Sequence, residues 1–261
     1  MEGMEVQPHI SLRKGQVEPV CIIVGDPART EAVANLCEKK RELTFCREFR
    51  SFSVEYDGQP LTVISHGIGA PGTAICCEEL IHLGAKVLIR AGTCGSLRPD
   101  LLKQGDLFVP YAAANDSGYV ANTMPPGFPC VCTPDVFQAI VEASKECLGK
   151  DVPTGIILTQ DQFYQSAILP SKLDLWSKVC DAVEMEMSAV CTVAHARRVA
   201  SGGIFTVDGS PLFWKEGDYD SSGEKTATGK RNMLKVALKA AASLRRKFPS
   251  HSGHTSASSQ E

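Results

Sequence analysis

The stretch from Leu61 to Leu83 reads LTVISHGIGAPGTAICCEELIHL and joins an apolar run, a glycine-rich turn and a helix-like segment. Leu61–Ser65 is typical of a buried strand, and we expect a helix over Ala74–Leu83 behind the turn. Similar strand-like runs recur along the chain, at Val20–Val24, Lys86–Arg90, Leu107–Pro110, Gly155–Leu158 and Gly203–Val207. The chain therefore repeats a strand-then-helix pattern.

That alternation predicts the fold class. Helix-like stretches such as Asp135–Cys147 and Met185–Arg197 separate several of the strand-like runs. The pattern favours a three-layer α/β/α fold with a largely parallel central sheet. One exception is the alternating segment Arg47–Tyr56, which Asp57 and Gly58 turn into the next strand. Because such a turn is typical of a hairpin, we expect the central sheet to be mixed.

Length and composition favour a single domain over residues 1–248. The 261 residues are 43% hydrophobic and 22% charged, which is ordinary for a globular chain that buries its own core. Apolar residues recur at helical spacing from Thr228 to Phe248 and predict an amphipathic helix that closes the domain. The remaining residues, 249–261, have low complexity, and we expect a disordered tail.

Charge and cysteine content narrow the classes of partner. The net charge of −3 leaves no basic surplus for nucleic acid or for an anionic membrane. We see no signal peptide and no apolar run long enough for a membrane span, so we expect a cytoplasmic protein. The 11 cysteines are scattered through apolar segments, and the pair Cys130 and Cys132 lacks a second pair of ligands. We therefore predict that most of these thiols are buried in a reducing compartment, and that there is no metal site.

The glycines of the quoted stretch match a dinucleotide-binding pattern only in part. Gly67, Gly69 and Gly72 match the G-x-G-x-x-G pattern of dinucleotide sites. However, the turn follows a hairpin instead of opening the first βαβ unit, and Pro71 lies inside it. The next strand-like run ends in Arg90, where an NAD site would have an acidic residue, so only an NADP-dependent oxidoreductase remains as an outside alternative.

A second turn follows the strand-like run Val20–Val24 and reads GDPAR. Asp26 is suited to cap a helix that begins at Pro27, which leaves free backbone N–H groups beside Arg29. This arrangement predicts an anion site. The alternative is a plain strand-to-helix turn with Arg29 in solvent.

A third turn, RAGTCGS, begins with Arg90 at the expected end of a strand. Gly92 and Gly95 would let the backbone approach a ligand, and Thr93 offers a hydroxyl group. An arginine at a buried strand end is costly unless an anion or a carboxylate meets it. Either a bound anion or a buried structural ion pair would satisfy it.

Five motifs, taken in order, carry a family resemblance: VGDPAR, SHGIGAPG, IRAGTCGS, VEMEMSAV and VDGSP. From about His9 to Phe248 the chain resembles the nucleoside phosphorylase family. It is most similar to the hexameric, bacterial-type purine nucleoside phosphorylases, in particular to the branch of protozoan parasites. The resemblance implies reversible, phosphate-dependent cleavage of inosine or guanosine to purine and ribose 1-phosphate. It also implies a homohexamer with shared active sites and no cofactor, because inorganic phosphate is a co-substrate.

The resemblance also implies a set of site residues. The phosphate would be held by Gly25, Arg29, Arg90 and Thr93, together with Arg47 of a neighbouring subunit. The ribose would contact Tyr164, Glu184, Met185 and Glu186, together with His9 of an adjacent subunit. The base would lie against Cys94, Gly95, Val183, Trp214 and Asp208. In this interpretation Asp208 donates a proton to purine N7, which requires a raised pKa such as burial provides.

Several alternatives stay open at this point. Uridine phosphorylases carry an arginine shortly after a phenylalanine-containing motif, and the corresponding segment here, DQFYQSAILPSKL, has none. Nucleosidases of the same fold lack the phosphate arginines, and non-catalytic storage relatives would be expected to lose the acid or the phosphate clamp. The long polar loop Ser210–Glu224 is interpreted as a lid, although Trp214 could equally anchor the core.

Overall fold

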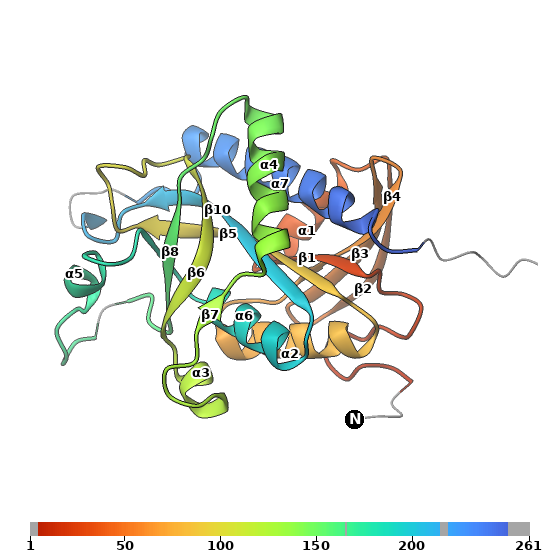
Figure 1. Cartoon of the computed structure of the whole chain (residues 1–261), viewed down its shortest axis with the longest axis horizontal. Coiled ribbons are helices and arrows are strands. Elements are labelled where there is room, and N and C mark those ends of the chain that lie inside the picture. The colour runs from red at the N-terminus through yellow and green to blue at the C-terminus, as the bar shows by residue number, and fades with distance from the viewer. Residues whose placement is uncertain (1–4, 165, 215–218, 250–261) are drawn as a thin grey trace, which may run out of the picture.

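The computed structural model describes residues 5–164, 166–214 and 219–249. Within these residues one mixed sheet of ten strands has helices on both faces (Figure 1). The strands are β1 (Val20–Val24), β2 (Lys39–Cys46), β3 (Phe49–Tyr56), β4 (Gln59–Ser65), β5 (Val87–Ser96), β6 (Leu107–Asp116), β7 (Cys130–Val131), β8 (Thr154–Gln160), β9 (Ala182–Glu184) and β10 (Ala200–Gly209). The helices are α1 (Pro27–Ala34), α2 (Ala70–His82), α3 (Gly118–Thr123), α4 (Pro134–Leu148), α5 (Leu173–Trp176), α6 (Met187–Ala196) and α7 (Glu224–Arg245).

The centre of the sheet is β5. It pairs in parallel with β1 and β10 and antiparallel with β9. Because β10 also pairs with β6, β6 with β8, and β8 with β9, these five strands close into a ring. The other side of the sheet stays open, in the order β1, β4, β3, β2. One part of the sheet is therefore closed into a barrel, and the other part is an open sheet.

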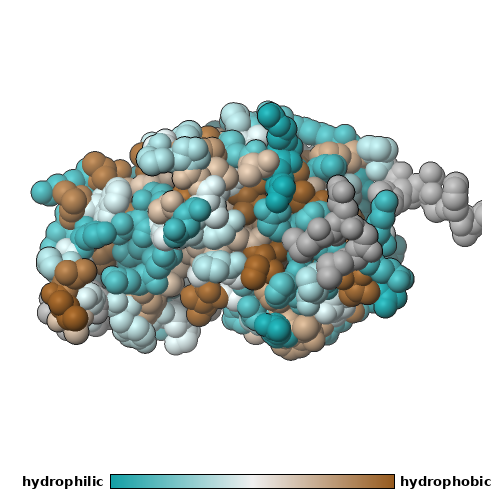
Figure 2. All heavy atoms as spheres, turned by 90° about the horizontal axis from the view of Figure 1, so that it is seen from below, coloured by the Kyte–Doolittle hydropathy of each residue, from teal (hydrophilic) through white to brown (hydrophobic). Residues whose placement is uncertain are grey.

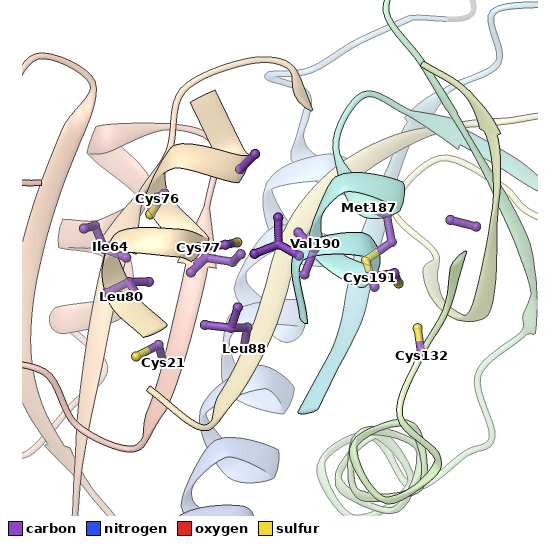
Figure 3. Packing of buried hydrophobic residues seen from close by; sticks show 14 of the residues in the cluster. Cys21, Ile64, Cys76, Cys77, Leu80, Leu88, Cys132, Met187, Val190 and Cys191 are labelled. Atoms are coloured by element: carbon purple, nitrogen blue, oxygen red, sulfur yellow. The ribbon is translucent and has the colours of Figure 1, made fainter. Parts of the chain in front are cut away.

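The two faces of β1 show how the layers are held. Val20, Ile22 and Val24 pack in one apolar cluster with residues of α4 and α7. Cys21 and Ile23 point to the opposite face and pack in a second cluster with α2 and α6. Figure 3 shows several cysteines of α2 and α6 in this second cluster, where they act as small buried hydrophobes. The predicted three-layer α/β/α architecture is confirmed.

The hairpin is also confirmed. Asp57 and Gly58 adopt positive φ angles of 52° and 66° and connect β3 to β4, which pair antiparallel. In contrast, the edge strand β2 was not predicted, because its sequence KKRELTFC is mostly polar and more than half of its residues are exposed. Charged edge strands of this kind carry a weak apolar signal because one side faces solvent.

Two element boundaries differ from prediction in ways that matter for the site. We expected a strand to end at Arg90, but β5 continues to Ser96 because β10 pairs with it as far as Gly95. We also expected a helix from Met185, but α6 begins at Met187, with Glu186 at the N-cap position. Arg90 thus lies inside a strand, while Glu186 lies at a strand-to-helix junction.

Hydrophilic and hydrophobic side chains are intermixed over the face seen in Figure 2. Among the described residues, no helix combines the length and the apolar character needed to cross a membrane. The predicted tail falls almost entirely on residues 250–261, which lie outside the described part of the chain.

Candidate active site

A cavity of about 870 Å³ opens at the carboxyl ends of β1, β5, β9 and β10. Ligands of open α/β sheets bind at the carboxyl ends of the strands. The cavity lies at this edge here too, although five of the strands close into a ring. The cavity is lined by all the predicted site residues except His9 and Arg47. These are Gly25, Arg29, Arg90, Thr93, Cys94, Gly95, Tyr164, Val183, Glu184, Met185, Glu186, Asp208 and Trp214.

The turn from β1 into α1 presents Arg29 to the cavity. Asp26 caps the helix by accepting a hydrogen bond from the N–H of Ala28 at 2.8 Å, as predicted, and Pro27 occupies the first helical position. The Arg29 guanidinium has no ion pair within the described residues. Burial, together with the nearby Arg90, lowers the pKa of Arg29. A half-buried cation in this setting favours binding of an anion.

Arg90 is held from three sides. Its Nε donates to Glu184 at 3.0 Å, its Nη2 donates to Glu186, and the guanidinium lies 5.3 Å from the ring centroid of Phe205. Burial alone would lower the pKa of Arg90, but the two carboxylates outweigh burial and keep that pKa above its ordinary value. The structural ion pair foreseen for Arg90 is therefore present, and Arg90 also lines the cavity.

Gly92 makes room for this arrangement. A Cβ atom on Gly92 would lie 2.9 Å from Nη2 of Arg90 and 3.1 Å from Cε1 of Phe205. Since the side chains of residues 90 and 92 share one face of β5, only glycine leaves space for the guanidinium to fold back along the strand.

The two glutamates occupy different environments. The carboxylate of Glu184 accepts from Thr159 Oγ1 at 2.6 Å and from the N–H groups of Glu186 and Met187, in addition to Arg90. These contacts anchor the start of α6. The resemblance placed Glu184 at the ribose, yet its oxygens are already engaged within the chain. Glu186 keeps more free acceptor capacity, because each of its oxygens has a single donor in the described residues.

The glycine-rich turn lies between β4 and α2 and packs against the turn between β1 and α1. The N–H of Gly67 donates to the carbonyl of Gly25 at 3.0 Å, and the N–H of Gly69 donates to Glu186 at 2.6 Å. Gly67 has a φ angle of +76°, and a Cβ there would lie 2.8 Å from Cγ of Glu48. The turn therefore orients a carboxylate and lines the cavity through Gly67 and Ile68.

Asp208 lies near the end of β10 and is 9% exposed. Burial raises the pKa of Asp208 to about 6, although Thr93, Lys230 and Arg29 act in the opposite direction. A carboxyl group with such a pKa is able to donate a proton close to neutral pH. The raised pKa that the sequence interpretation required is therefore present.

An aromatic cluster forms the outer wall of the cavity. The ring centroids of Phe163 and Trp214 lie 4.8 Å apart, and those of Trp214 and Tyr219 lie 5.3 Å apart. Only Trp214 and the neighbouring Tyr164 were predicted; Phe163 and Tyr219 were missed, although the aromatic pair in DQFYQ was a usable signal. Residues 215–218 of the predicted lid lie outside the described residues, and Tyr219 pairs with Gly209 beside Asp208.

His9 and Arg47 do not line the cavity of their own chain. His9 is tied to α2, because its Nδ1 lies 2.6 Å from Oε1 of the buried Glu79. Arg47 is exposed at the turn between β2 and β3, with a left-handed φ angle of 55°. The sequence interpretation placed both residues in the site of another subunit, which is compatible with these positions.

Residues 19–243 match the family model described as the phosphorylase superfamily. The chain belongs to the phosphorylase superfamily. The crystal structure of purine nucleoside phosphorylase from Toxoplasma gondii in complex with immucillin-H is similar, with a TM-score of 0.93 and 64% identity. That similarity covers 95% of this chain and 100% of the other. The Plasmodium vivax purine nucleoside phosphorylase is 41% identical, over 95% of this chain and 100% of its own length.

A solved Plasmodium knowlesi homologue of P. falciparum PNP also has this superfamily fold, with a TM-score of 0.82 and 38% identity. It covers 95% of this chain and 97% of its own. The resemblance that five short motifs predicted is thus confirmed over nearly the whole chain. In the phosphorylase superfamily member described here, those motifs meet around one cavity.

Proposed function

We infer that the protein is a purine nucleoside phosphorylase, a pentosyltransferase that moves a ribosyl group between a purine and phosphate. One observation carries this inference: a free cation, an acceptor carboxylate and a protonatable acid face the same cavity. These are Arg29, Glu186 and Asp208. Phosphorolysis needs these three groups, because it must hold a phosphate, orient a ribose and protonate a leaving base.

Phosphate would bind at the carboxyl ends of β1 and β5. Arg29 supplies a guanidinium that has no ion pair within the described residues, and Thr93 supplies a hydroxyl group. The sequence predicted free N–H groups at the start of α1, but Pro27 has none and those of Ala28 and Arg29 already donate to Asp26, so the phosphate donors here are side chains. Arg90 adds further donors from inside the sheet. Guanidinium groups suit a phosphate dianion because each presents paired N–H donors.

The ribose would lie between phosphate and base. Glu186 would accept hydrogen bonds from the 2′ and 3′ hydroxyls, and Met185, which lines the same cavity, would add an apolar surface. As the bond between C1′ and N9 breaks, its electron pair moves into the purine, and positive charge develops on the sugar. An oxygen of phosphate then forms the new bond to C1′, which yields ribose 1-phosphate.

Asp208 would complete the reaction by giving its proton to purine N7. The purine accepts the electron pair of the broken bond more easily when N7 becomes protonated, so proton donation lowers the barrier. The aromatic wall of Phe163, Trp214 and Tyr219 offers flat apolar surface to a base. Purine is favoured over uracil by Asp208 and by the absence of an arginine in DQFYQSAILPSKL.

We also propose a homohexamer built from dimers, located in the cytoplasm. His9 and Arg47 support the assembly, because both lie outside their own cavity and Arg47 is exposed for contact with another subunit. All 11 cysteines are free thiols, which supports a reducing compartment.

Absorbance of inosine during incubation with the purified protein tests the proposal. We expect cleavage only when millimolar phosphate is present, together with activity on guanosine and little on uridine. Equal cleavage without phosphate would indicate a nucleosidase, and preferential cleavage of uridine would indicate a uridine phosphorylase. No cleavage of any nucleoside would favour a binding or storage protein.

A further inference from the structure

A closed ring of hydrogen bonds joins the glycine-rich turn to the charged centre of the cavity. Nη1 of Arg90 lies 2.9 Å from Nε2 of His66, and Nδ1 of His66 lies 2.9 Å from Oγ1 of Thr73. The Thr73 hydroxyl reaches the carbonyl of Gly69 at 3.0 Å. The N–H of Gly69 reaches Glu186, and Glu186 returns to Nη2 of Arg90.

Proton donors and acceptors fix the direction of every bond in this ring. Arg90 only donates, so Nε2 of His66 carries no proton. The Gly69 carbonyl only accepts, so the single hydroxyl proton of Thr73 points to it. Thr73 Oγ1 must then accept from His66, which places the imidazole proton on Nδ1. Burial and the charge of Arg90 lower the pKa of His66 well below its ordinary value, in agreement with a neutral ring.

His66 and Thr73 are placed to act through other residues. Both are fully buried, and neither lines the cavity. His66 lies directly before the turn, whereas Thr73 lies in the first turn of α2. Their polar atoms face the ring, and the reaction described above uses neither of them.

The charges around Arg90 explain why a neutral residue such as His66 suits this position. Arg90 already faces two carboxylates, Glu184 and Glu186. A third carboxylate would hold the guanidinium equally well, but it would add negative charge beside an incoming phosphate. A neutral imidazole accepts a hydrogen bond and leaves the cationic charge intact. Three of the five N–H groups of Arg90 are engaged within the described residues, which leaves one on Nη1 and one on Nη2.

We propose that His66 and Thr73 are positioning residues that hold Arg90 and Glu186 as one unit. The ring sets the two remaining N–H groups of Arg90 toward phosphate while it fixes the Glu186 carboxylate beside the ribose. The inference rests on the proposed function, because it assigns those two ligands to the cavity. Both reactants would then be held at a constant separation, and misplacement by about 1 Å is known to cost up to about 10²-fold in rate.

The first test compares Thr73→Val with Thr73→Ser. Valine removes the hydroxyl and opens the ring, whereas serine keeps it. We expect Thr73→Val to raise the KM for phosphate by about tenfold or more, with a smaller change in kcat, and Thr73→Ser to restore most of the loss. Thr62→Val is the matched control, because the Thr62 hydroxyl is also buried and accepts a hydrogen bond, from the N–H of Glu18, but takes no part in the ring of hydrogen bonds.

Thr62→Val should leave the KM for phosphate unchanged. A merely structural role for Thr73 would lower thermal stability and the active fraction of both valine variants alike, without raising that KM. An unchanged KM in a folded Thr73→Val enzyme would overturn the proposal. If the wild type cleaves no nucleoside with phosphate, the proposed function fails instead, so the two failures are distinguishable.

A second test compares two replacements of His66. His66→Gln keeps a neutral acceptor for Arg90, whereas His66→Glu keeps an acceptor but adds negative charge. We expect the glutamine variant to bind phosphate severalfold more tightly than the glutamate variant; the reverse order would overturn the proposal.

The tautomer of His66 gives a spectroscopic signature that does not depend on turnover. In wild-type protein labelled with ¹⁵N-histidine, we expect the His66 ring to be neutral near pH 7 and protonated on Nδ1. Loss of this signal in His66→Gln assigns it to His66. A His66 imidazole protonated on Nε2 would contradict the proposed ring of hydrogen bonds.

Discussion

At the scale of single residues, Asp208 links the chemistry of the cavity to the stability of the fold. Its carboxyl group is held in a buried position where the pKa rises to about 6. The burial that would suit the proposed proton donor also disfavours the ionised form, so we expect Asp208 to lower the stability of the fold above its pKa.

The first prediction concerns turnover. Asp208→Asn keeps the shape of the side chain but removes the acidic proton. Because general acid catalysis contributes about 10² to 10⁴ in rate, we expect phosphorolysis of inosine to slow by a factor in that range. Steady-state assays at saturating phosphate measure the effect. Turnover equal to that of the wild type would remove Asp208 from the mechanism.

The second prediction concerns stability and pH. The folded pKa of Asp208 lies above the ordinary value of 3.8, so the folded state binds the proton more tightly than the unfolded state does. The free energy of unfolding therefore falls as pH rises from about 4 to about 6, by an amount on the order of 2 to 3 kcal/mol.

Asparagine cannot ionise and avoids this loss. We expect Asp208→Asn to be more stable than the wild type in urea unfolding at pH 7.5, with the difference shrinking toward pH 4. A variant that is less stable than the wild type at pH 7.5 would contradict the raised pKa.

At the scale of elements, strand β5 fixes the position of the Arg90 guanidinium. Arg90 and Gly92 lie on one face of this strand, and the guanidinium occupies the space that a side chain at residue 92 would take. A strand interior is an unusual place for a buried arginine, and here two carboxylates from the β9–α6 junction neutralise it.

The third prediction follows from that contact. Gly92→Ala places a Cβ about 2.9 Å from Nη2 of Arg90, so the guanidinium must shift away from its carboxylates. We expect catalytic efficiency toward phosphate to fall about tenfold or more. Gly118→Ala serves as the control, because a Cβ there meets nothing closer than 3.6 Å. Equal activity of the two variants would argue against the described position of Arg90.

Local patterns in the sequence predicted some elements well and others poorly. β1, the Asp57-Gly58 hairpin and the capped start of α1 follow from apolar runs and turn chemistry within a few residues. The extension of β5 to Ser96 does not, because it depends on pairing with β10, more than a hundred residues away. The engagement of Glu184 with Thr159 has the same origin, since contact between separate strands leaves no local signal.

At the scale of the whole molecule, the site gathers residues from nearly every part of the chain. The motifs that line the cavity extend from Gly25 to Asp208, and the closed ring of five strands brings their ends together. His9 and Arg47 are the exceptions, because neither lines the cavity of its own chain.

The fourth prediction tests shared sites by mixing two impaired enzymes. If Arg47 acts across a two-fold interface, Arg47→Ala and Asp208→Asn should each have low activity alone. A hybrid of the two contains one intact site, formed by Asp208 of one subunit and Arg47 of the other. We expect activity to recover after the variants are dissociated and reassociated together. No recovery in hybrids of verified composition would show that Arg47 does not act across the interface.

In the proposed reaction, phosphate and not water attacks the ribosyl group. Its most direct test is to incubate the protein with inosine and inorganic phosphate, and to quantify hypoxanthine and ribose 1-phosphate in the same sample. We expect equal amounts of the two products and no hypoxanthine when phosphate is omitted. Hypoxanthine accompanied by free ribose would contradict this expectation.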